Sequence, residues 1–385
     1  MKKPIYLDHA ATTAVEPEVV AAMLPYFEEE YGNPASVHRW GQRAEHALSS
    51  ARKTIASALN CRADEIIFTS CGSESDNLAL RGAAMAARES GRGNHLVVSA
   101  VEHPAVLNTA RQLRAQHNFE LTELPVDEHG LTSIEDLSGA LRADTGLVSI
   151  MYANNEIGVI TPITALASAA RAQGALFHTD AVQASSQLPL DVEALGVDML
   201  SLSAHKFYGP KGVGLLYARR GTALQPAQTG GGQEAGRRAG THNVPQIVGM
   251  AAALQLTVER RQQDCIRMES QRNRLIDAVL DSVSDSRLTG HRTKRLANNA
   301  SFVFAGIDGN ELLMHLDLAG VAASSGSACK TGSPEPSTVL RALGLPPRWA
   351  LGSLRLSVGR HTQSDEIEHT LSVLPAIIER MRADD

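Results

Sequence analysis

The sequence predicts an α/β fold, with a large domain built on a mostly parallel sheet and a smaller α+β domain. Short apolar segments alternate with helical segments through the first two-thirds of the 385 residues, the order that gives a parallel sheet covered on both faces. After "TGGGQEAGRRAGTHN", residues 229–243, this alternation stops. The chain is also longer than one hydrophobic core comfortably serves. We therefore expect a large domain at 16–260 and a smaller one formed by 1–15 and 261–385.

The expected elements of the large domain follow from apolar periodicity and from helix-start residues. Pro17 and Pro104 stand at the starts of two expected helices, and Ser73 is the expected N-cap of another. Short apolar runs bounded by polar residues predict strands. Helices are predicted at 16–30, 38–59, 73–90, 104–116 and 163–173, and strands at 65–70, 94–100, 119–124, 146–152, 175–180, 198–203 and 212–220.

The smaller domain is expected to mix both kinds of element. A long helical segment runs from about 244 to 283 and is followed by a strand at 298–306 and a helix at 309–319. A short helix at 337–345, a strand at 352–360 and a C-terminal helix complete it.

Composition excludes several classes of protein. The formal net charge is −6 with no basic stripe, which argues against nucleic-acid binding and against a membrane anchor. No apolar run is long enough to span a bilayer, and Asp8 interrupts any signal-peptide pattern. The four cysteines show no spacing typical of zinc, so we expect no metal site. Free thiols in so long a chain indicate a reducing cytoplasm.

Polar residues follow the predicted strands at the point where each strand ends. They occur at 70–73, 102–103, 154–155, 180 and 203–206. In open parallel sheets, ligands bind beyond the carboxyl ends of the strands. The coincidence of these residues predicts a binding site at this edge of the sheet.

Lys206, in "SAHKFYGPKG", has two interpretations. It is either a surface lysine at a strand end or a desolvated lysine that binds a carbonyl cofactor covalently. The second interpretation needs an acidic partner, and Asp180 could pair with the pyridine nitrogen of pyridoxal phosphate. A phosphate would need donors, which Gly72, Ser73, Ser203 and His205 could supply, although Ser73 could equally be an ordinary helix cap.

Four further side chains are candidates for the same site. His103 is either a structural histidine or a residue that stacks on a cofactor ring and carries protons. Asn155 and Gln183 can hydrogen-bond a phenolic oxygen without charging it. Arg355 is either a surface charge or a fork for a substrate carboxylate.

Cys329 lies in "SSGSACKTGSP", residues 324–334. A small, polar, Gly/Ser-rich segment is typical of a flexible loop, which is a poor setting for a packed core cysteine. The neighbouring Lys330 favours the thiolate. We therefore expect a reactive thiol that travels with its loop.

Many ordered motifs together resemble one enzyme family. They include "YLDHAATT", "FTSCGSESDN", "EHPAV", "NNEIGV", "FHTDAVQ", "SAHKFYGPKG", "RRAGT", "SSGSAC" and "EPSTVLRALG". In these segments the sequence resembles the pyridoxal-phosphate cysteine desulfurases, close to class V aminotransferases, and most of all the branch serving iron–sulfur or nitrogenase cluster assembly. The resemblance implies a fold-type I enzyme with a mostly parallel, seven-stranded-type sheet, working as a cytoplasmic homodimer.

The resemblance also implies roles for the residues and a reaction. Lys206 would carry pyridoxal 5'-phosphate, Asp180 would pair with its ring nitrogen, and His103 would stack on the ring. Asn155 and Gln183 would contact the phenolic oxygen, Asn155 and Arg355 the substrate carboxylate. Gly72, Ser73, Ser203 and His205 would hold the phosphate, with Thr241 reaching the phosphate of the other subunit. L-Cysteine would become L-alanine, with its sulfur left as a persulfide on Cys329 and passed to an acceptor or iron–sulfur scaffold protein.

Other functions stay open at this point. A selenocysteine lyase or another aminotransferase-type enzyme would keep the cofactor, and a non-catalytic partner would keep only the fold. Nitrogenase clusters, general iron–sulfur clusters and thionucleosides are all candidate destinations of the sulfur. The sequence departs from the family pattern at His9, where Asn or Tyr is common, and at Lys330, where a small hydroxyl residue is usual.

Overall fold

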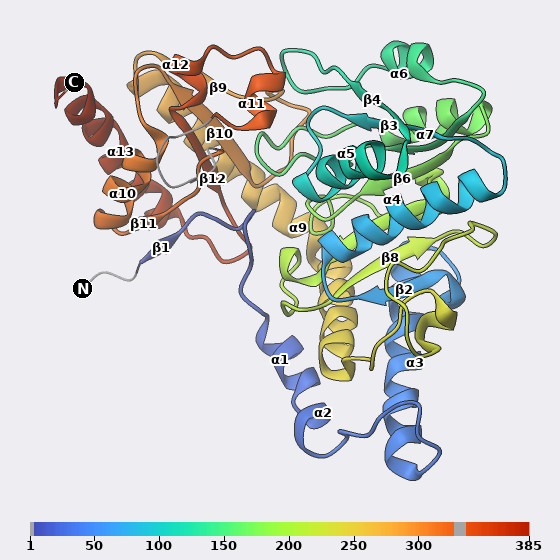
Figure 1. The fold of residues 1–385 in the computed structure, drawn as a ribbon. Helices are drawn as coiled ribbons and strands as arrows, with labels where there is room; N and C mark the ends of the chain where they lie inside the picture. The colour runs from blue at the N-terminus through green and yellow to red at the C-terminus, as the bar shows by residue number, and fades with distance from the viewer. Residues whose placement is uncertain (1–3, 327–335, 385) are drawn as a thin grey trace.

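A computed structural model describes residues 4–326 and 336–384, and it confirms the predicted α/β architecture (Figure 1). The large sheet has seven strands in the order β2-β8-β7-β6-β5-β3-β4. All neighbouring pairs are parallel except those of β8, which is antiparallel to both β2 and β7. Its strands are β2 (Ile66–Thr69), β3 (His95–Ser99), β4 (Glu120–Leu124), β5 (Thr145–Ser149), β6 (Leu176–Asp180), β7 (Met199–Ser203) and β8 (Gly214–Ala218).

Apolar side chains cover both faces of this sheet. In β2, Ile67 packs with α4 (Gly72–Glu89) and α5 (Pro104–His117), whereas its neighbours Ile66 and Phe68 belong to the cluster on the other face. That second cluster includes residues of α3 (Arg39–Leu59), α7 (Ile163–Ala172) and the first part of α9. Alternate strand residues point to opposite faces, so strands buried on both sides read as continuous apolar runs.

The smaller unit holds two further sheets and a core of its own. Strands β12 (Ser353–Ser357), β10 (Asn299–Phe304) and β9 (Ser286–Leu288) form an antiparallel sheet, and β1 (Ile5–Tyr6) pairs in parallel with β11 (Val321–Ala322). Four helices accompany them: α10 (Gly309–Leu318), α11 (Thr338–Ala342), α12 (Pro347–Ala350) and α13 (Ser364–Asp384). The core of this unit joins Ile5 and Leu7 to residues between 268 and 381.

A single long helix, α9 (Val244–Ser282), belongs to both units. Its residues Ile247 and Leu254 lie in the core of the large sheet, while Leu275 and Val279 lie in the core of the smaller unit. The predicted division between 260 and 261 falls inside this helix. The division into 16–260 against 1–15 and 261–385 stays a prediction, which these two cores support.

Two helices differ from the prediction. The helix expected at 16–30 is divided into α1 (Pro17–Met23) and α2 (Pro25–Glu28), because a proline inside a helix removes a hydrogen bond and clashes with the preceding turn. Ser73 is not the N-cap of α4. The helix already begins at Gly72 with Cys71 in extended conformation before it, so Ser73 is the second helical residue.

Three more helices were not predicted: α6 (Ile134–Ala140), α8 (Val192–Leu195) and the short α12. Ser133 and Asp191 accept hydrogen bonds from the first amides of α6 and α8. Within the described ranges, no helix is long and apolar enough to cross a membrane. The same ranges hold no group of three or more His, Cys, Asp or Glu side chains placed to bind a metal ion.

Candidate active site

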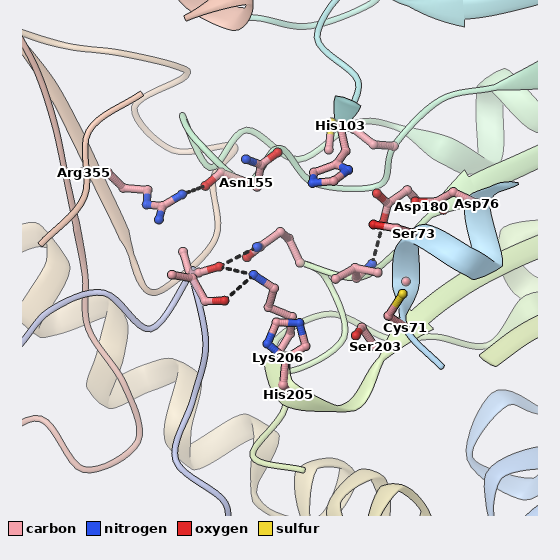
Figure 2. Close-up of a pocket in the computed structure, with 16 residues that line it drawn as sticks. Cys71, Ser73, Asp76, His103, Asn155, Asp180, Ser203, His205, Lys206 and Arg355 are labelled. Carbon is pink, nitrogen blue, oxygen red and sulfur yellow. Dashed lines mark hydrogen bonds between the residues drawn. The ribbon is translucent and has the colours of Figure 1, made fainter. Parts of the chain in front are cut away.

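A cavity of about 250 Å³ opens where the carboxyl ends of the parallel strands meet (Figure 2). The structure brings together in its wall every predicted site residue that it describes, with the exception of Thr241. The lining residues are Ala10, Ala11, Cys71, Gly72, Ser73, Asp76, His103, Met151, Asn155, Asp180, Val182, Gln183, Ser203, His205, Lys206 and Arg355. Their grouping follows from the topology, since each parallel strand delivers its following residues to the same edge.

Lys206 ends the 3-10 turn that follows β7, and its amine points into the cavity (Figure 2). Its Nζ donates hydrogen bonds to the carbonyl oxygens of Ala10, at 2.6 Å, and Ala11, at 2.7 Å. Burial and the nearby charge of Arg355 lower the pKa of Lys206 to about 8, although Asp180 and Asp8 oppose the shift. A useful fraction of the amine is therefore neutral near physiological pH, as a nucleophilic lysine requires.

Asp180, at the end of β6, and His103, the N-cap of α5, both line the cavity. Burial raises the pKa of Asp180, while His103 and a hydrogen bond from the amide of Val182 work against that rise. Burial also lowers the pKa of His103. Its Nδ1 accepts the amide of Ala105 at 3.0 Å and so caps α5, which leaves Nε2 to carry the proton of the neutral ring.

The start of α4 forms an anion cradle, which we define as the amides and hydroxyls of Gly72, Ser73 and Ser203. The side chain of Cys71 accepts no hydrogen bond from the first amides of α4, so among the described residues these amides have no side-chain cap. A Cβ atom on Gly72 would stand 2.8 Å from Cγ2 of Val182 and 3.4 Å from Cβ of Ser203. Glycine is thus required for close approach, and a helix N-terminus of this kind favours an anion.

His205 and Gln183 hold the N-terminal segment against the cavity wall through hydrogen bonds to Thr12 and Ala10. Nδ1 of His205 lies 3.2 Å from Oγ1 of Thr12, and burial lowers the pKa of His205 to about 4, so its ring is neutral at physiological pH. Nε2 of Gln183 donates to the carbonyl of Ala10 at 2.8 Å, which is the same oxygen that Lys206 contacts.

Arg355 reaches the cavity from β12 of the smaller unit. Its guanidinium donates to the carbonyl of Asn155 at 2.7 Å and to Oδ1 of Asp8 at 2.9 Å. Its buried Nε has no hydrogen-bond partner among the described residues. The arginine is therefore held beside Asn155, with its Nε–H unpaired among the described residues.

Several lining groups were not predicted. The carbonyls of Ala10 and Ala11 are backbone atoms, which no side-chain pattern reveals. Asp76 had a detectable signal: it lies four residues after Gly72 and so on the same face of α4. It is buried, and its Oδ1 lies 3.7 Å from Nε2 of His178 but accepts no hydrogen bond in the described part of the chain. Burial beside Asp180 raises the pKa of Asp76 well above the ordinary range.

Two predicted residues are not among the described residues of the cavity wall. Thr241 is exposed, outside the cavity of its own chain. Cys329 falls outside the described residues, as does Lys330. The described residues on either side of that segment both approach Glu156: Gly326 stands where a Cβ would be 2.7 Å from its Oε2, and Oγ of Ser337 donates to the same oxygen at 2.5 Å. Glu156 is the residue after Asn155, which lines the cavity.

Comparison with known proteins agrees with this geometry. The aminotransferase class-V family profile matches residues 5–370. Over 382 residues the chain is 48% identical to the cysteine desulfurase IscS of Dictyoglomus turgidum, which covers 99% of this chain and 96% of that protein. It is 44% identical over 379 residues to a cysteine desulfurase of Trichormus azollae, covering 98% of this chain and 94% of that one.

Solved structures give the same result. A NifS-like protein, 35% identical, superposes with a TM-score of 0.92 and covers 98% of this chain and all of its own. SspA, solved in complex with cysteine, is also 35% identical, with a TM-score of 0.81 over 93% of this chain and 100% of that one. The family profile and the fold thus place the chain in the aminotransferase class-V family. Within that family, the chain belongs to the cysteine desulfurases.

Proposed function

We propose that this protein is a pyridoxal-phosphate-dependent cysteine desulfurase in which the predicted site residues hold the roles given above. The observation that carries the proposal is the cavity itself, where a partly neutral lysine, a buried carboxyl and an uncapped helix start share one wall. The enzymes of this family depend on pyridoxal phosphate. Their cofactor supplies an aldehyde for an amine and a ring that withdraws electrons from the substrate.

The residues present fit that cofactor. Lys206 is the amine for the aldehyde, and Asp180 is the carboxyl for the pyridine nitrogen. Gly72 leaves room that a side chain would fill, at a helix start suited to a phosphate. The same lysine, once free, is placed to hold and release a proton at its Nζ, because carbonyl oxygens orient it.

The substrate end of the cavity is set by Asn155 and Arg355. A guanidinium fork recognises a carboxylate through parallel hydrogen bonds, and here its position is fixed by the carbonyl of Asn155 and by Asp8. His103, with its Nδ1 occupied, presents Nε2 to the cavity and can take or give a proton there.

For the sulfur step we propose Cys329 as the acceptor thiol. The thiolate attacks the sulfur of L-cysteine, the Cβ–S bond breaks, a proton goes to carbon, and an S–S bond forms on the enzyme. L-Cysteine and one thiol thus become L-alanine and one persulfide, with no external oxidant. Ser337, which follows the segment with Cys329, donates a hydrogen bond to Glu156, and a Cβ on Gly326, which precedes that segment, would stand 2.7 Å from the same carboxylate. Glu156 is next to Asn155 in the sequence, which supports this role.

We further propose a homodimer that works in the cytoplasm and passes sulfur to an acceptor in iron–sulfur cluster assembly, nitrogenase clusters included. The N-terminal helices α1, α2 and the start of α3 project from the rest of the chain (Figure 1). These helices and the segments that join them expose large apolar side chains, namely Val20, Leu24, Phe27, Tyr31, Val37 and Trp40. Such a patch marks an interaction surface, and a second copy would also bring Thr241 to its partner's cradle.

Mass spectrometry of the purified protein after brief exposure to L-cysteine tests the proposal. We expect equimolar alanine and one added sulfur on the peptide with Cys329. A Cys329→Ser variant should bind cofactor and substrate yet gain no sulfur. Sulfur found instead on Cys61, Cys71 or Cys265 would refute the role of Cys329. A comparison of kcat/KM for L-cysteine and L-selenocysteine separates a desulfurase from a selenocysteine lyase.

A further inference from the structure

A charged pair that the proposed function does not use lies beside the anion cradle. Glu74 is the third residue of α4, directly after Gly72 and Ser73. Arg238 belongs to the Gly-rich segment 229–243. Nε of Arg238 donates to Oε1 of Glu74 at 2.7 Å, and its Nη2 donates to Oε2 at 3.2 Å. Only 17% of the arginine side chain and 23% of the glutamate side chain are exposed, so this is a bidentate pair shielded from much of the solvent.

The carboxylate of Glu74 also fixes the turn that enters α4. Its Oε2 accepts the backbone N–H of Ser70 at 2.7 Å and the hydroxyl of the same residue. Ser70 is the residue after β2, and Cys71 follows it as the N-cap of α4. Glu74 therefore sets the path of the chain from the strand into the helix, and with it the direction of the first helix amides.

Without Arg238, the negative charge of Glu74 would be unfavourable beside the anion cradle. Burial raises the pKa of Glu74, but hydrogen bonds from Arg238 and Ser70 outweigh burial, and the pKa is lowered overall. The group is therefore a carboxylate at neutral pH. A carboxylate in the first turn of a helix competes with any other anion for the positive end of the helix dipole, and it repels a phosphate in the adjacent cradle.

Arg238 is held in place by its own segment. Glu234, four residues earlier, pairs with Arg52 of α3 at 2.7 Å and with Nε2 of His242 at 2.6 Å. The segment is thus tied to the large domain at one point by Glu234 and at another by Arg238. A guanidinium delivered by a tied segment loses less side-chain freedom in its pair than one on an open surface.

We propose that Arg238 and Glu74 are positioning residues for the phosphate of the cofactor. Glu74 holds the turn at 70–71 so that the amides of Gly72 and Ser73 face the cavity, and Arg238 cancels the negative charge which that carboxylate brings to the cradle. The inference rests on the proposed binding of pyridoxal phosphate. Neither side chain lines the cavity, so both act through the cradle and not on the reacting atoms.

The two halves of the pair should respond differently to neutralisation. Arg238→Gln leaves an uncompensated carboxylate beside the phosphate and should weaken binding of pyridoxal 5'-phosphate by roughly tenfold. Glu74→Gln keeps an oxygen that can accept the hydrogen bonds of Ser70, and it leaves the guanidinium of Arg238 without a negative partner. Binding of pyridoxal 5'-phosphate should therefore be unchanged or tighter. The double variant, with both charges removed, should recover most of the affinity for pyridoxal 5'-phosphate that Arg238→Gln loses.

The test is titration of the cofactor-free protein with pyridoxal 5'-phosphate and, separately, with pyridoxal, followed by absorbance. Because pyridoxal lacks the phosphate, its affinity should be the same in the wild type and in all three variants. Arg142→Gln is the matched control. That arginine forms a bidentate pair with Asp144 and contacts Glu120 on an exposed surface, and its loss should leave both affinities unchanged.

Other results would contradict either this inference or the proposed function, and the two cases can be told apart. If Glu74→Gln weakens phosphate binding as much as Arg238→Gln, or if pyridoxal is weakened equally, the pair supports only the local fold and the inference is wrong. If the variants all bind both compounds like the wild type, it is also wrong, while the proposed function stands. If the wild type binds neither compound, the proposed function itself fails. Should Arg238→Gln not accumulate, Arg238→Lys keeps the charge and should retain wild-type discrimination between the two compounds.

Discussion

The two sides of the cavity differ in how their charges are compensated. On the sheet side, Lys206 forms hydrogen bonds to two carbonyl oxygens and, among the described residues, no ion pair, and burial shifts the pKa values of Lys206, Asp180 and His103. On the smaller unit's side, Arg355 is already paired with Asp8 at 2.9 Å. The difference suggests that the sheet side is built for groups that change protonation, and the other side for one fixed charge.

Replacement of Lys206 tests the sheet side and should have the largest effect. Lys206→Ala removes the amine for the cofactor and the proton carrier, so we expect no covalent attachment and a loss of turnover of roughly 10²- to 10⁴-fold from proton transfer alone. Absorbance before and after borohydride, with peptide mapping, measures attachment. Lys211→Ala is the control, since that side chain is exposed and lies outside the cavity. Reduced cofactor on any other lysine would contradict the assignment.

Replacement of Arg355 tests the opposite side. Arg355→Leu should raise KM for L-cysteine by about 10- to 100-fold, because a hydrogen bond to a charged group contributes about 1.5–3 kcal/mol. Steady-state kinetics measures it. Asp8→Asn weakens the competing partner of the same guanidinium, and we expect its KM to be unchanged or lower. A fall in kcat with no change in KM would show that Arg355 does not bind the substrate carboxylate.

A methyl group on Gly72 tests the anion cradle between the two sides. Gly72→Ala places a Cβ 2.8 Å from a methyl of Val182, so the wall must shift, and we expect about tenfold weaker binding of pyridoxal phosphate. Equilibrium titration measures it. Gly139→Ala is the matched control, because a Cβ there meets nothing within 4 Å. Equal affinities in the two variants would place the phosphate elsewhere.

The pH dependence of cofactor attachment should be the smallest effect. The pKa of Lys206 is lowered to about 8, so the reactive neutral amine is the minor form below that pH and the major form above it. The attachment rate in the cofactor-free protein should therefore rise about fivefold from pH 7 to pH 8 and level off above pH 9. His205, with a pKa of about 4, does not titrate in this range. Stopped-flow absorbance measures the rate, and a rise that continues towards pH 10.5 would mean an ordinary lysine.

Much of the fold and of the site could be predicted from the sequence, because both depend on local signals. Apolar runs such as 198–203 are long enough to show as strands, and the residue after each strand is fixed by topology. The predictions for Asp180 and Lys206 rested on that rule, and the cavity contains both. The N-cap of α4 was misplaced by two residues, at Ser73 instead of Cys71, since a hydroxyl near a helix start resembles a cap whether or not it is used as one.

The rest depends on contacts between distant parts of the chain. The carbonyls of Ala10 and Ala11 meet Lys206 across nearly two hundred residues, and backbone oxygens have no sequence signature. The pairing of Arg238 with Glu74 spans a similar separation. Asp76 was within reach of prediction, because helical periodicity places it below Gly72, but its burial depends on how α4 packs on the sheet.

The long helix α9 also has a consequence for unfolding. At 1.5 Å per residue its 39 residues span about 58 Å, and they supply buried side chains to both hydrophobic cores. Near its middle, Asp264 accepts a hydrogen bond at 2.6 Å from Arg360 of the smaller unit, whose guanidinium also binds Glu16 at 2.9 Å. Unfolding of the middle of α9 would break this buried ion network and disrupt both hydrophobic cores at once. The amides around Asp264 should therefore exchange with solvent only when the whole chain opens, and the two units should lose their structure in one cooperative transition.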